Sequence, residues 1–273
     1  MDKENNLNKN LETLAQKMRY TALEMSFNCR EATHLGGGLS IIEIMAVLYG
    51  KILILDNSKM ISDRNRFILS KGHGVLGLLS ALHCVGILSK DEIMTFQTNG
   101  SKYIAHPIMN LEAGIESSNG SLGQGLSMGV GIALSYLKTK RKGEIFVLIG
   151  DGECYEGSIW EAAISAVELN LDNLTVIVDC NGFQNDGAIG KGMNFESISK
   201  KWAGFGWKCS ICDGHNINEI IKSLNTKSDG VPKAVLAKTI KGKGISFMEN
   251  NNDWHHNRLT QKLFDEAKKD LGL

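Results

Sequence analysis

Proline is scarce in this sequence, and Pro107 and Pro232 are the only two among 273 residues. Low-complexity stretches and internal repeats are missing too, so no linker or repeat boundary divides the chain. A chain of this length can bury about three quarters of its unfolded surface. The sequence therefore predicts one folded domain over residues 1–273.

Net charge and long apolar runs are also missing. Thirty basic and thirty acidic residues cancel, so no overall field attracts nucleic acid or an anionic membrane. No apolar run reaches the roughly 18 residues that a membrane span needs. The N-terminal segment MDKENNLNKNLETLAQKMRY has no apolar signal-peptide core. These absences predict a cytoplasmic protein with neither a membrane nor a nucleic-acid partner.

The six cysteines do not suggest a disulfide framework. They lie mostly inside or beside apolar runs, which favours reduced, packed thiols. Cys209 and Cys212 form a single CxxC with no second pair. A zinc or redox site is therefore the less favoured interpretation of that motif.

What the sequence does contain is an alternation of helical and strand patterns. Helical spacing runs from Leu11 to Met25, and Ser40 with Glu43 is a candidate capping box for a second helix. Helical spacing also covers 75–86 and 159–169, and apolar strands are predicted at 66–70, 144–149, 174–178, 207–211 and 234–239. Strands that are apolar throughout, alternating with helices, indicate an α/β fold whose parallel sheet is covered on both faces.

Polar residues follow two successive predicted strands. Gly150-Asp151-Gly152 comes directly after one strand, and Asn181 comes just after the next. A right-handed crossover places such strands side by side, with their carboxyl ends at one sheet edge. Asp151 and Asn181 would then offer a charged and a neutral oxygen to one pocket. Mg²⁺ prefers such hard oxygen ligands and keeps further positions for water or phosphate.

This pattern resembles the GDG…N motif of enzymes that use thiamine diphosphate. The resemblance implies that Asp151, Asn181 and the backbone carbonyl of Phe183 hold a divalent metal ion, Mg²⁺ or alternatively Ca²⁺ or Mn²⁺. That ion would bind the diphosphate of thiamine diphosphate, with Gly152 and Asn181 also at the cofactor. The implied fold is the diphosphate-binding type of thiamine-diphosphate domain.

Five further segments, in order along the chain, resemble segments of transketolases. They are His34 with its glycines, Ser70–Gly74 around His73, His106-Pro107, the loop Gly120–Gly125, and Trp254-His255. The resemblance covers about residues 11–270, equivalent to the amino-terminal third to half of a transketolase. It implies transfer of a two-carbon ketol group from a ketose to an aldose acceptor.

The resemblance also assigns roles to these residues. His34, His106 and His255 would bind the sugar and move protons, which histidine can do near neutral pH. His73 would bind the diphosphate, His255 would reach both cofactor and sugar, and Gly120, Ser121 and Leu122 would pack on the cofactor.

Other polar residues receive weaker or structural assignments. His83 and His215 are interpreted as structural, and His256 stands where the family usually has glycine, which leaves the aim of His255 less defined. Glu156 and Glu161 match a stretch that forms carboxylate networks across the family's dimer, although solvated helix positions explain them equally well. Glu153 receives no role.

Transketolases also need a glutamate at the pyrimidine ring of the cofactor, and it comes from a second domain on the neighbouring subunit. The chain reaches Leu273 soon after the His255 segment. We therefore expect the amino-terminal subunit of a split transketolase, active only with a separately encoded carboxy-terminal partner that supplies this glutamate, in an α2β2 assembly. The sugar donor and acceptor stay open, with an anionic ketose expected.

Three alternatives remain at this point. The α subunit of a 2-oxo acid dehydrogenase carries a similar GDG…N site, but the contexts of His34, His73 and His106 favour transketolase. A non-catalytic cofactor-binding or regulatory subunit is a second alternative. A Rossmann-type nucleotide module is a third, although no strand is followed by a clear GxGxxG motif.

Overall fold

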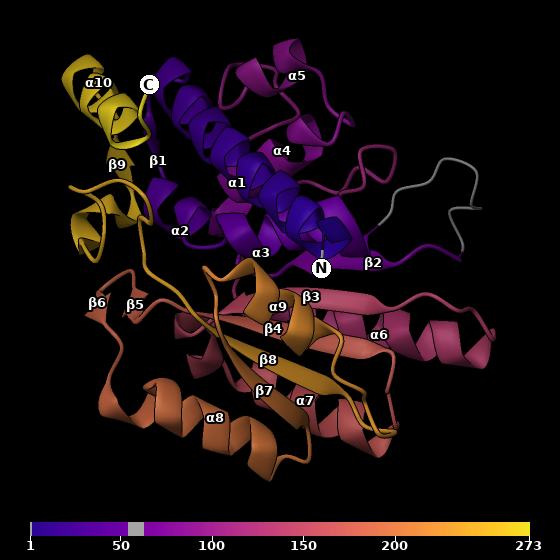
Figure 1. Cartoon of the computed structure of the whole chain (residues 1–273). Helices are drawn as coiled ribbons and strands as arrows, with labels where there is room; N and C mark the ends of the chain where they lie inside the picture. The colour runs from indigo at the N-terminus through magenta and orange to yellow at the C-terminus, as the bar shows by residue number, and fades with distance from the viewer. Residues whose placement is uncertain (1, 54–62) are drawn as a thin grey trace.

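The computed structural model of the chain describes residues 2–53 and 63–273. Within these residues, the main sheet has five parallel strands in the order β2-β3-β4-β8-β7 (Figure 1). The strands are Arg66–Leu69 (β2), Ile145–Gly150 (β3), Leu174–Cys180 (β4), Lys208–Asp213 (β7) and Lys233–Lys238 (β8). The predicted parallel α/β sheet is confirmed, and each predicted strand is found within one or two residues of its expected bounds.

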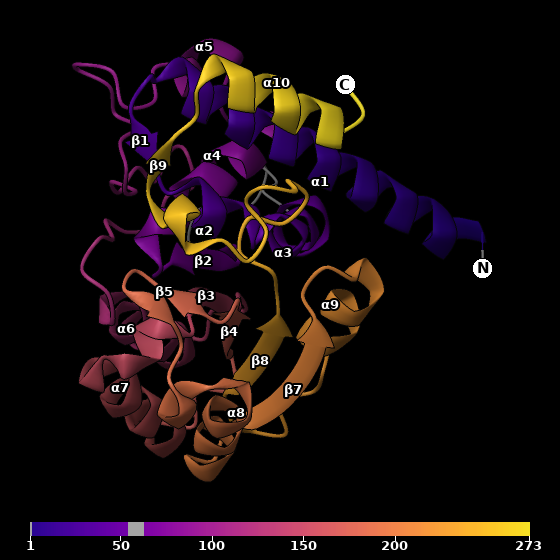
Figure 2. The same ribbon diagram turned by 90° about the vertical axis from the view of Figure 1, so that its left-hand side faces the viewer.

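Helices cover both faces of this sheet (Figures 1 and 2). One layer contains α1 (Asp2–Asn28), α3 (Ile42–Val47), α4 (Val75–Cys84) and α9 (Ile217–Leu224), and the other contains α6 (Gln124–Lys138), α7 (Gly157–Glu168) and α8 (Phe195–Gly204). Successive strand residues point to opposite layers, so that Phe146 and Leu148 join the first core while Val147 and Ile149 join the second. Burial on both faces explains why these strands are apolar throughout.

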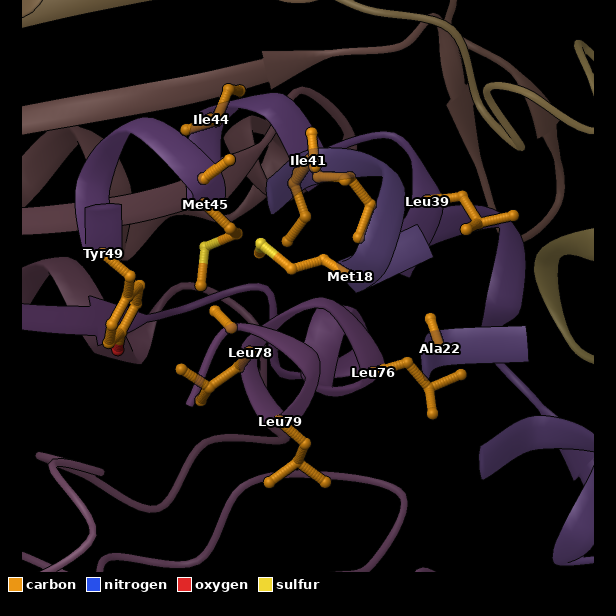
Figure 3. Close-up of a cluster of buried hydrophobic side chains, with 14 of the residues drawn as sticks. Met18, Ala22, Leu39, Ile41, Ile44, Met45, Tyr49, Leu76, Leu78 and Leu79 are labelled. Atoms are coloured by element: carbon orange, nitrogen blue, oxygen red, sulfur yellow. The ribbon is translucent and has the colours of Figure 1, made fainter. Parts of the chain in front are cut away.

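The first core lies between α1, α3 and α4. Figure 3 shows Met18 of α1 close to Ile41 and Met45, with Leu76 and Leu78 of α4 on the other side. All five side chains are at most 2% exposed. Burying a side chain of this size contributes about 1.5–3 kcal/mol, so this cluster fixes the early helices against the sheet.

Two short antiparallel ribbons extend beyond the carboxyl edge of the sheet. β1 (Ala32–Thr33) pairs with β9 (Asn257–Arg258), and β5 (Phe183–Gln184) pairs with β6 (Gly187–Ala188). After β9, α10 (Gln261–Asp270) packs on α1, where Phe27 and Phe264 stack with ring centroids 4.4 Å apart. The chain's last segment therefore lies beside its first, as Figure 2 also shows.

One predicted helix start is wrong. Ser40 closes the short helix α2 (Leu35–Leu39), and α3 begins only after Ile41. The Ser40 hydroxyl lies within hydrogen-bonding distance of the Gly37 carbonyl (3.0 Å) and of the Asp179 carboxylate (2.7 Å). Ser40 therefore takes part in a buried polar network and does not begin the next helix.

The CxxC cysteines do not converge on one site. Both are free; Cys209 packs against the core on the α6–α8 side of β7, and Cys212 belongs to the core on the opposite face. Neither a disulfide nor a shared metal suits that arrangement, in line with the prediction of packed thiols. Among the described residues, no helix is long and apolar enough to cross a membrane.

Candidate functional site

Asp151 and Asn181 follow the ends of neighbouring strands. β3 and β4 pair in parallel with Gly150 opposite Asp179, so both side chains lie at the carboxyl edge of the sheet. The Asp151 carboxylate accepts hydrogen bonds from the backbone N–H groups of Gly152 (2.8 Å) and Gly182 (2.7 Å). Gly182 is the residue after Asn181, so the second of these bonds joins the two strand tips directly.

A cavity of about 230 Å³ opens at these tips. Its walls contain predicted cofactor and metal residues from five separate segments of the chain. They are His73, Leu122, Asp151, Gly152, Asn181, Phe183 and His255. Gly120 and Ser121 do not line this cavity. Gly120 instead lies beside the His106 ring, where a Cβ atom would be 3.6 Å from the ring.

Beneath the cavity, a fully buried ion pair links β2 and β4. Lys71, which follows β2, donates to the carboxylate of Asp179, and both side chains are 0% exposed. Ser40, Thr239 and Asn181 also donate to Asp179. Burial alone would raise the pKa of Asp179, but the Lys71 charge and these hydrogen bonds hold it below its ordinary value. The network fixes the Asn181 amide, because its nitrogen is held by Asp179.

Asp151 is in the opposite electrostatic position. It is 4% exposed, and burial, followed by the nearby charge of Asp179, raises its pKa to about 7. The carboxylate has no cationic hydrogen-bond partner among the described residues; the donors that reach it are backbone N–H groups. A cation beside Asp151 would supply the charge that the site lacks.

The donor set fits a divalent ion bound to a diphosphate. Each oxygen of Asp151 accepts one backbone hydrogen bond and keeps a free lone pair, and the Asn181 amide oxygen does the same after accepting from Phe183 N–H at 3.0 Å. Among the described residues, no group of three or more His, Cys, Asp and Glu side chains could hold a metal. A carboxylate, an amide and a backbone carbonyl are what remain, and they suit Mg²⁺ with phosphate oxygens completing its shell.

Glu153, to which the sequence assigned no role, ties three segments of the site together. It is 2% exposed and accepts from the Ser70 hydroxyl at 2.5 Å, from Gly123 N–H at 2.8 Å and from Gly150 N–H at 3.1 Å. Burial raises its pKa despite these hydrogen bonds. Gly123 adopts φ +84°, a left-handed conformation, where a side chain would also collide with Ser158 and Glu156. Glu153 therefore sets the Gly120–Gly125 loop relative to the strand tips.

Five histidines gather beside the cavity. The His34 ring lies 5.9 Å from His73, 5.4 Å from His106, 5.6 Å from His255 and 4.5 Å from His256, measured between ring centroids. Segments that lie near opposite ends of the sequence thus meet at His34. All four histidines predicted to contact cofactor or sugar are in this cluster.

The imidazoles of His34, His73, His106 and His255 are held in their neutral form. Burial, followed by the nearness of other histidines, lowers the pKa of His34 to about 3, and burial and Lys241 lower that of His255 to about 4. Burial and Lys71 lower the pKa of His73 well below its usual value, and burial and His256 lower that of His106. At neutral pH each ring can donate one hydrogen bond and accept another.

Lys241, also unassigned from the sequence, fixes His255. Its ammonium contacts His255 Nδ1 at 2.8 Å and donates to Asn252 at 2.7 Å. Burial, with the charge of Lys71, lowers the pKa of Lys241 to about 8. The backbone at His256 is extended (φ −146°, ψ 101°), so a side chain fits there without strain. The orientation of the His255 ring is therefore fixed by these contacts, although His256 stands where the family usually has glycine.

The remaining predicted residues lie around this centre. His83 bonds the Leu88 carbonyl at 2.8 Å, and His215 links Glu43 (2.9 Å) to Ile240 N–H (2.8 Å), so both have the structural contacts predicted for them. Glu156 is exposed at the start of α7 and lines the cavity, whereas Glu161 is an exposed position further along α7.

Four charged residues of the site were missed, namely Lys71, Glu153, Asp179 and Lys241. Asp179 carries a signal that sequence reasoning can use, because it is a charged residue ending an otherwise apolar buried strand. Lys71 has a weaker one, since it stands between β2 and His73. Nothing in the local pattern of Glu153 or Lys241 distinguishes them from surface residues.

The description "Transketolase, thiamine diphosphate binding domain" belongs to a family model that matches residues 12–273. The chain belongs to the transketolase family. The match covers almost all of the chain, including the strand tips, the five histidines and both ribbons.

Individual transketolases agree with this assignment. The chain is 38% identical to an apulose-4-phosphate transketolase subunit of Actinobacillus succinogenes, over 90% of each chain. It is also 38% identical to a 6-deoxy-6-sulfo-D-fructose transketolase subunit of Clostridium sp., over 87% of this chain and 88% of the relative. The transketolase structure from Campylobacter jejuni superposes with a TM-score of 0.88 at 28% identity, over 96% of this chain and 43% of the other. The chain thus spans nearly the whole of the subunit relatives and about two fifths of that single-chain transketolase.

Membership in the transketolase family also bears on the alternatives. The family model is that of a thiamine-diphosphate-binding domain, so a Rossmann-type nucleotide module is excluded. The α subunit of a 2-oxo acid dehydrogenase is not favoured, because the relatives are transketolases.

Proposed function

We propose that this chain is the subunit of a split transketolase that binds the diphosphate of the cofactor. The enzyme transfers a two-carbon ketol group from an anionic ketose to an aldose. The observation that carries the proposal is the meeting, in one pocket, of the Asp151–Asn181 oxygen donors and the histidine cluster around His34. Thiamine diphosphate supplies the carbon that carries the ketol group. The chain's own residues bind, orient and move protons around it.

At the cavity end, Asp151, Asn181 and the Phe183 carbonyl hold the metal ion that neutralises the diphosphate. His73 and Gly152 lie in the wall of the same cavity, where they would contact the phosphates. Lys71 acts indirectly. Its ammonium pairs with the Asp179 carboxylate, and Asp179 in turn holds the Asn181 amide in place.

At the histidine end, neutral imidazoles of His34, His106 and His255 bind the hydroxyl and carbonyl oxygens of the ketose. When the bond between C2 and C3 breaks, its electron pair stays with the two-carbon ketol unit, while the C3 hydroxyl loses its proton and C3 becomes an aldehyde carbon. A neutral imidazole can accept that proton and return it to the acceptor's carbonyl oxygen in the reverse sense. Their lowered pKa values keep them uncharged before the reaction.

The rest of the site comes from a partner. The relatives from Actinobacillus succinogenes and Phocaeicola vulgatus are named as subunits, which implies a second chain, and we propose that it supplies the glutamate at the pyrimidine ring within an α2β2 assembly. The named relatives act on a sugar phosphate and on a sulfonated sugar, which supports an anionic ketose as the donor. A cytoplasmic location follows from the sequence prediction alone.

The deciding experiment co-expresses the chain with the product of a neighbouring reading frame that encodes the complementary half. We expect ketol transfer from a ketose phosphate to an aldose by the pair with thiamine diphosphate and Mg²⁺, and none by the purified single chain. Turnover with a 2-oxo acid and a lipoyl acceptor instead would contradict the proposal, as would full activity of the single chain.

The variant Asp151→Asn separates a catalytic from a regulatory role. We expect it to weaken Mg²⁺-dependent cofactor binding by several kcal/mol, because a charged hard ligand is lost. Calorimetric titration of thiamine diphosphate into the pair measures this, with the exposed Asp172→Asn as a matched control. Unchanged turnover of the Asp151→Asn pair would indicate a regulatory role.

A further inference from the structure

His256 is placed opposite His34 by the pairing of two strands. β1 and β9 are antiparallel with Thr33 opposite Asn257, so the next pair in register is His34 with His256. Directly opposed side chains on such a ladder lie close on the same face. The 4.5 Å between the two ring centroids is shorter than the separation of His34 from any other ring of the cluster.

His256 also faces His106 and lies at the mouth of the site. Burial and then the nearness of His256 lower the pKa values of both His34 and His106. The other four histidines are half-buried, whereas His256 is exposed. The cavity at the strand tips is lined by His73 and His255 but not by His256. His256 therefore lies on the outer side of His34, away from the diphosphate.

We infer that His256 is a specificity-determining residue, whose imidazole contacts the part of the sugar beyond the ketol unit. This inference rests on the proposed ketol transfer. The ketol carbons C1 and C2 must lie next to the cofactor, so C3 and the carbons after it extend toward the mouth. An imidazole there offers one donor and one acceptor to a sugar hydroxyl and restricts the space beside it.

The chemistry of the transfer gives this position a defined consequence. Breaking the C2–C3 bond releases everything from C3 onward as an aldose, and the acceptor aldose enters by the same route. His256 should therefore act on leaving aldoses and acceptors and have little influence on the ketol unit. A donor without an aldose part, such as hydroxypyruvate, which releases carbon dioxide, should not use this contact.

The test compares His256→Ala and His256→Asn in the reconstituted pair, loaded with thiamine diphosphate and Mg²⁺. For a ketose phosphate that the wild-type pair uses, we expect kcat/KM of His256→Ala to fall by about 3- to 10-fold, the range of one hydrogen bond. With hydroxypyruvate and glycolaldehyde we expect a change of less than about 2-fold on the same scale. His256→Asn, which keeps a donor and an acceptor, should restore part of the ketose activity. Asp253→Ala, an exposed change in the same turn, is the control.

A binding measurement complements the kinetics. The polyol phosphate obtained by reducing the ketose cannot react, so calorimetry reports its affinity for the loaded pair directly. We expect His256→Ala to change that affinity by the same 3- to 10-fold, about one hydrogen bond, and to leave thiamine diphosphate binding as in wild type.

The outcomes separate the inference from the proposed function. If the wild-type pair transfers no ketol group from any ketose, the proposed function fails. If it does, but His256→Ala alters ketose and hydroxypyruvate turnover equally or neither, the inference is overturned while the function stands. Weaker association of the two subunits with an unchanged donor ratio would instead place His256 at the subunit interface and would also overturn it.

Discussion

The two ends of this pocket differ in the charge of their side chains and in the elements that hold them. At the strand tips, Lys71, Asp179 and Asp151 are buried charges, held by regular strands of the main sheet and by a network of hydrogen bonds. At the histidine end, partly exposed rings lie in loops and short 3-10 turns, with His34 directly after β1 and His256 directly before β9. In the proposed function, the first end binds a charged group that is common to every reaction cycle, whereas the second contacts substrates that change.

This difference predicts where substitutions have their effects. Buried charges are costly when unpaired, so changes at the strand tips should lower stability and cofactor binding. Neutral rings near the mouth contribute little to folding, so changes there should lower turnover while the fold and the cofactor affinity persist.

The largest expected effect on stability comes from removing the buried ammonium group of Lys71. Lys71→Met leaves Asp179 charged and unpaired, and we expect the free energy of unfolding to fall by about 3–5 kcal/mol. Urea denaturation followed by tryptophan fluorescence measures the change. The double variant with Asp179→Asn should recover part of the loss.

The matched control for this prediction is an exposed ion pair. Lys90 and Glu24 form one in which the lysine side chain is 45% exposed. Lys90→Met should cost less than about 1 kcal/mol. If Lys71→Met were equally mild, the strand-tip network would not be the rigid part of the site.

The next effect concerns the histidine end. His34→Ala and His106→Ala should each lower kcat of the pair by about 10²-fold or more, the usual contribution of a positioned proton carrier, which corresponds to about 2.7 kcal/mol. Steady-state kinetics measure the loss, and calorimetry should give a thiamine diphosphate affinity close to wild type. Loss of cofactor binding in either variant would mean that the two ends are not separable.

The smallest effect is expected at Glu153, which links the strand tips to the Gly120–Gly125 loop. All of its hydrogen-bond partners are donors, so the amide nitrogen of Glu153→Gln would face a donor and one hydrogen bond would be lost. We expect a loss of about 1–2 kcal/mol in the free energy of unfolding. The exposed Glu168→Gln is the control, and equal stabilities of the two variants would remove Glu153 from the account.

The sequence predicts the sheet well because its physical signal is local. Each strand is a continuous apolar run, and the residues after β3 and β4 are polar, so the position of Asp151 and Asn181 follows from topology alone. Helix ends are less predictable, as Ser40 illustrates. Its hydroxyl satisfies Asp179, which is 139 residues away in the chain, and no local pattern records that partner.

The candidate site divides in the same way. Histidines in glycine-rich segments could be predicted from resemblance, and the structure brings all of them to His34. Glu153 and Lys241 could not, because their importance comes from burial and from partners that only the folded chain supplies. His256 looked like a departure that would disturb the site, yet the β1–β9 register gives it a place beside His34.

We propose that Asp151 and Asn181 together hold the metal ion of the cofactor. A crystal structure of the pair with thiamine diphosphate and Mn²⁺ tests it through the anomalous scattering of the metal. We expect one strong peak at about 2 Å from an oxygen of each side chain and from the diphosphate. A bound cofactor whose metal peak lies away from both residues would contradict it.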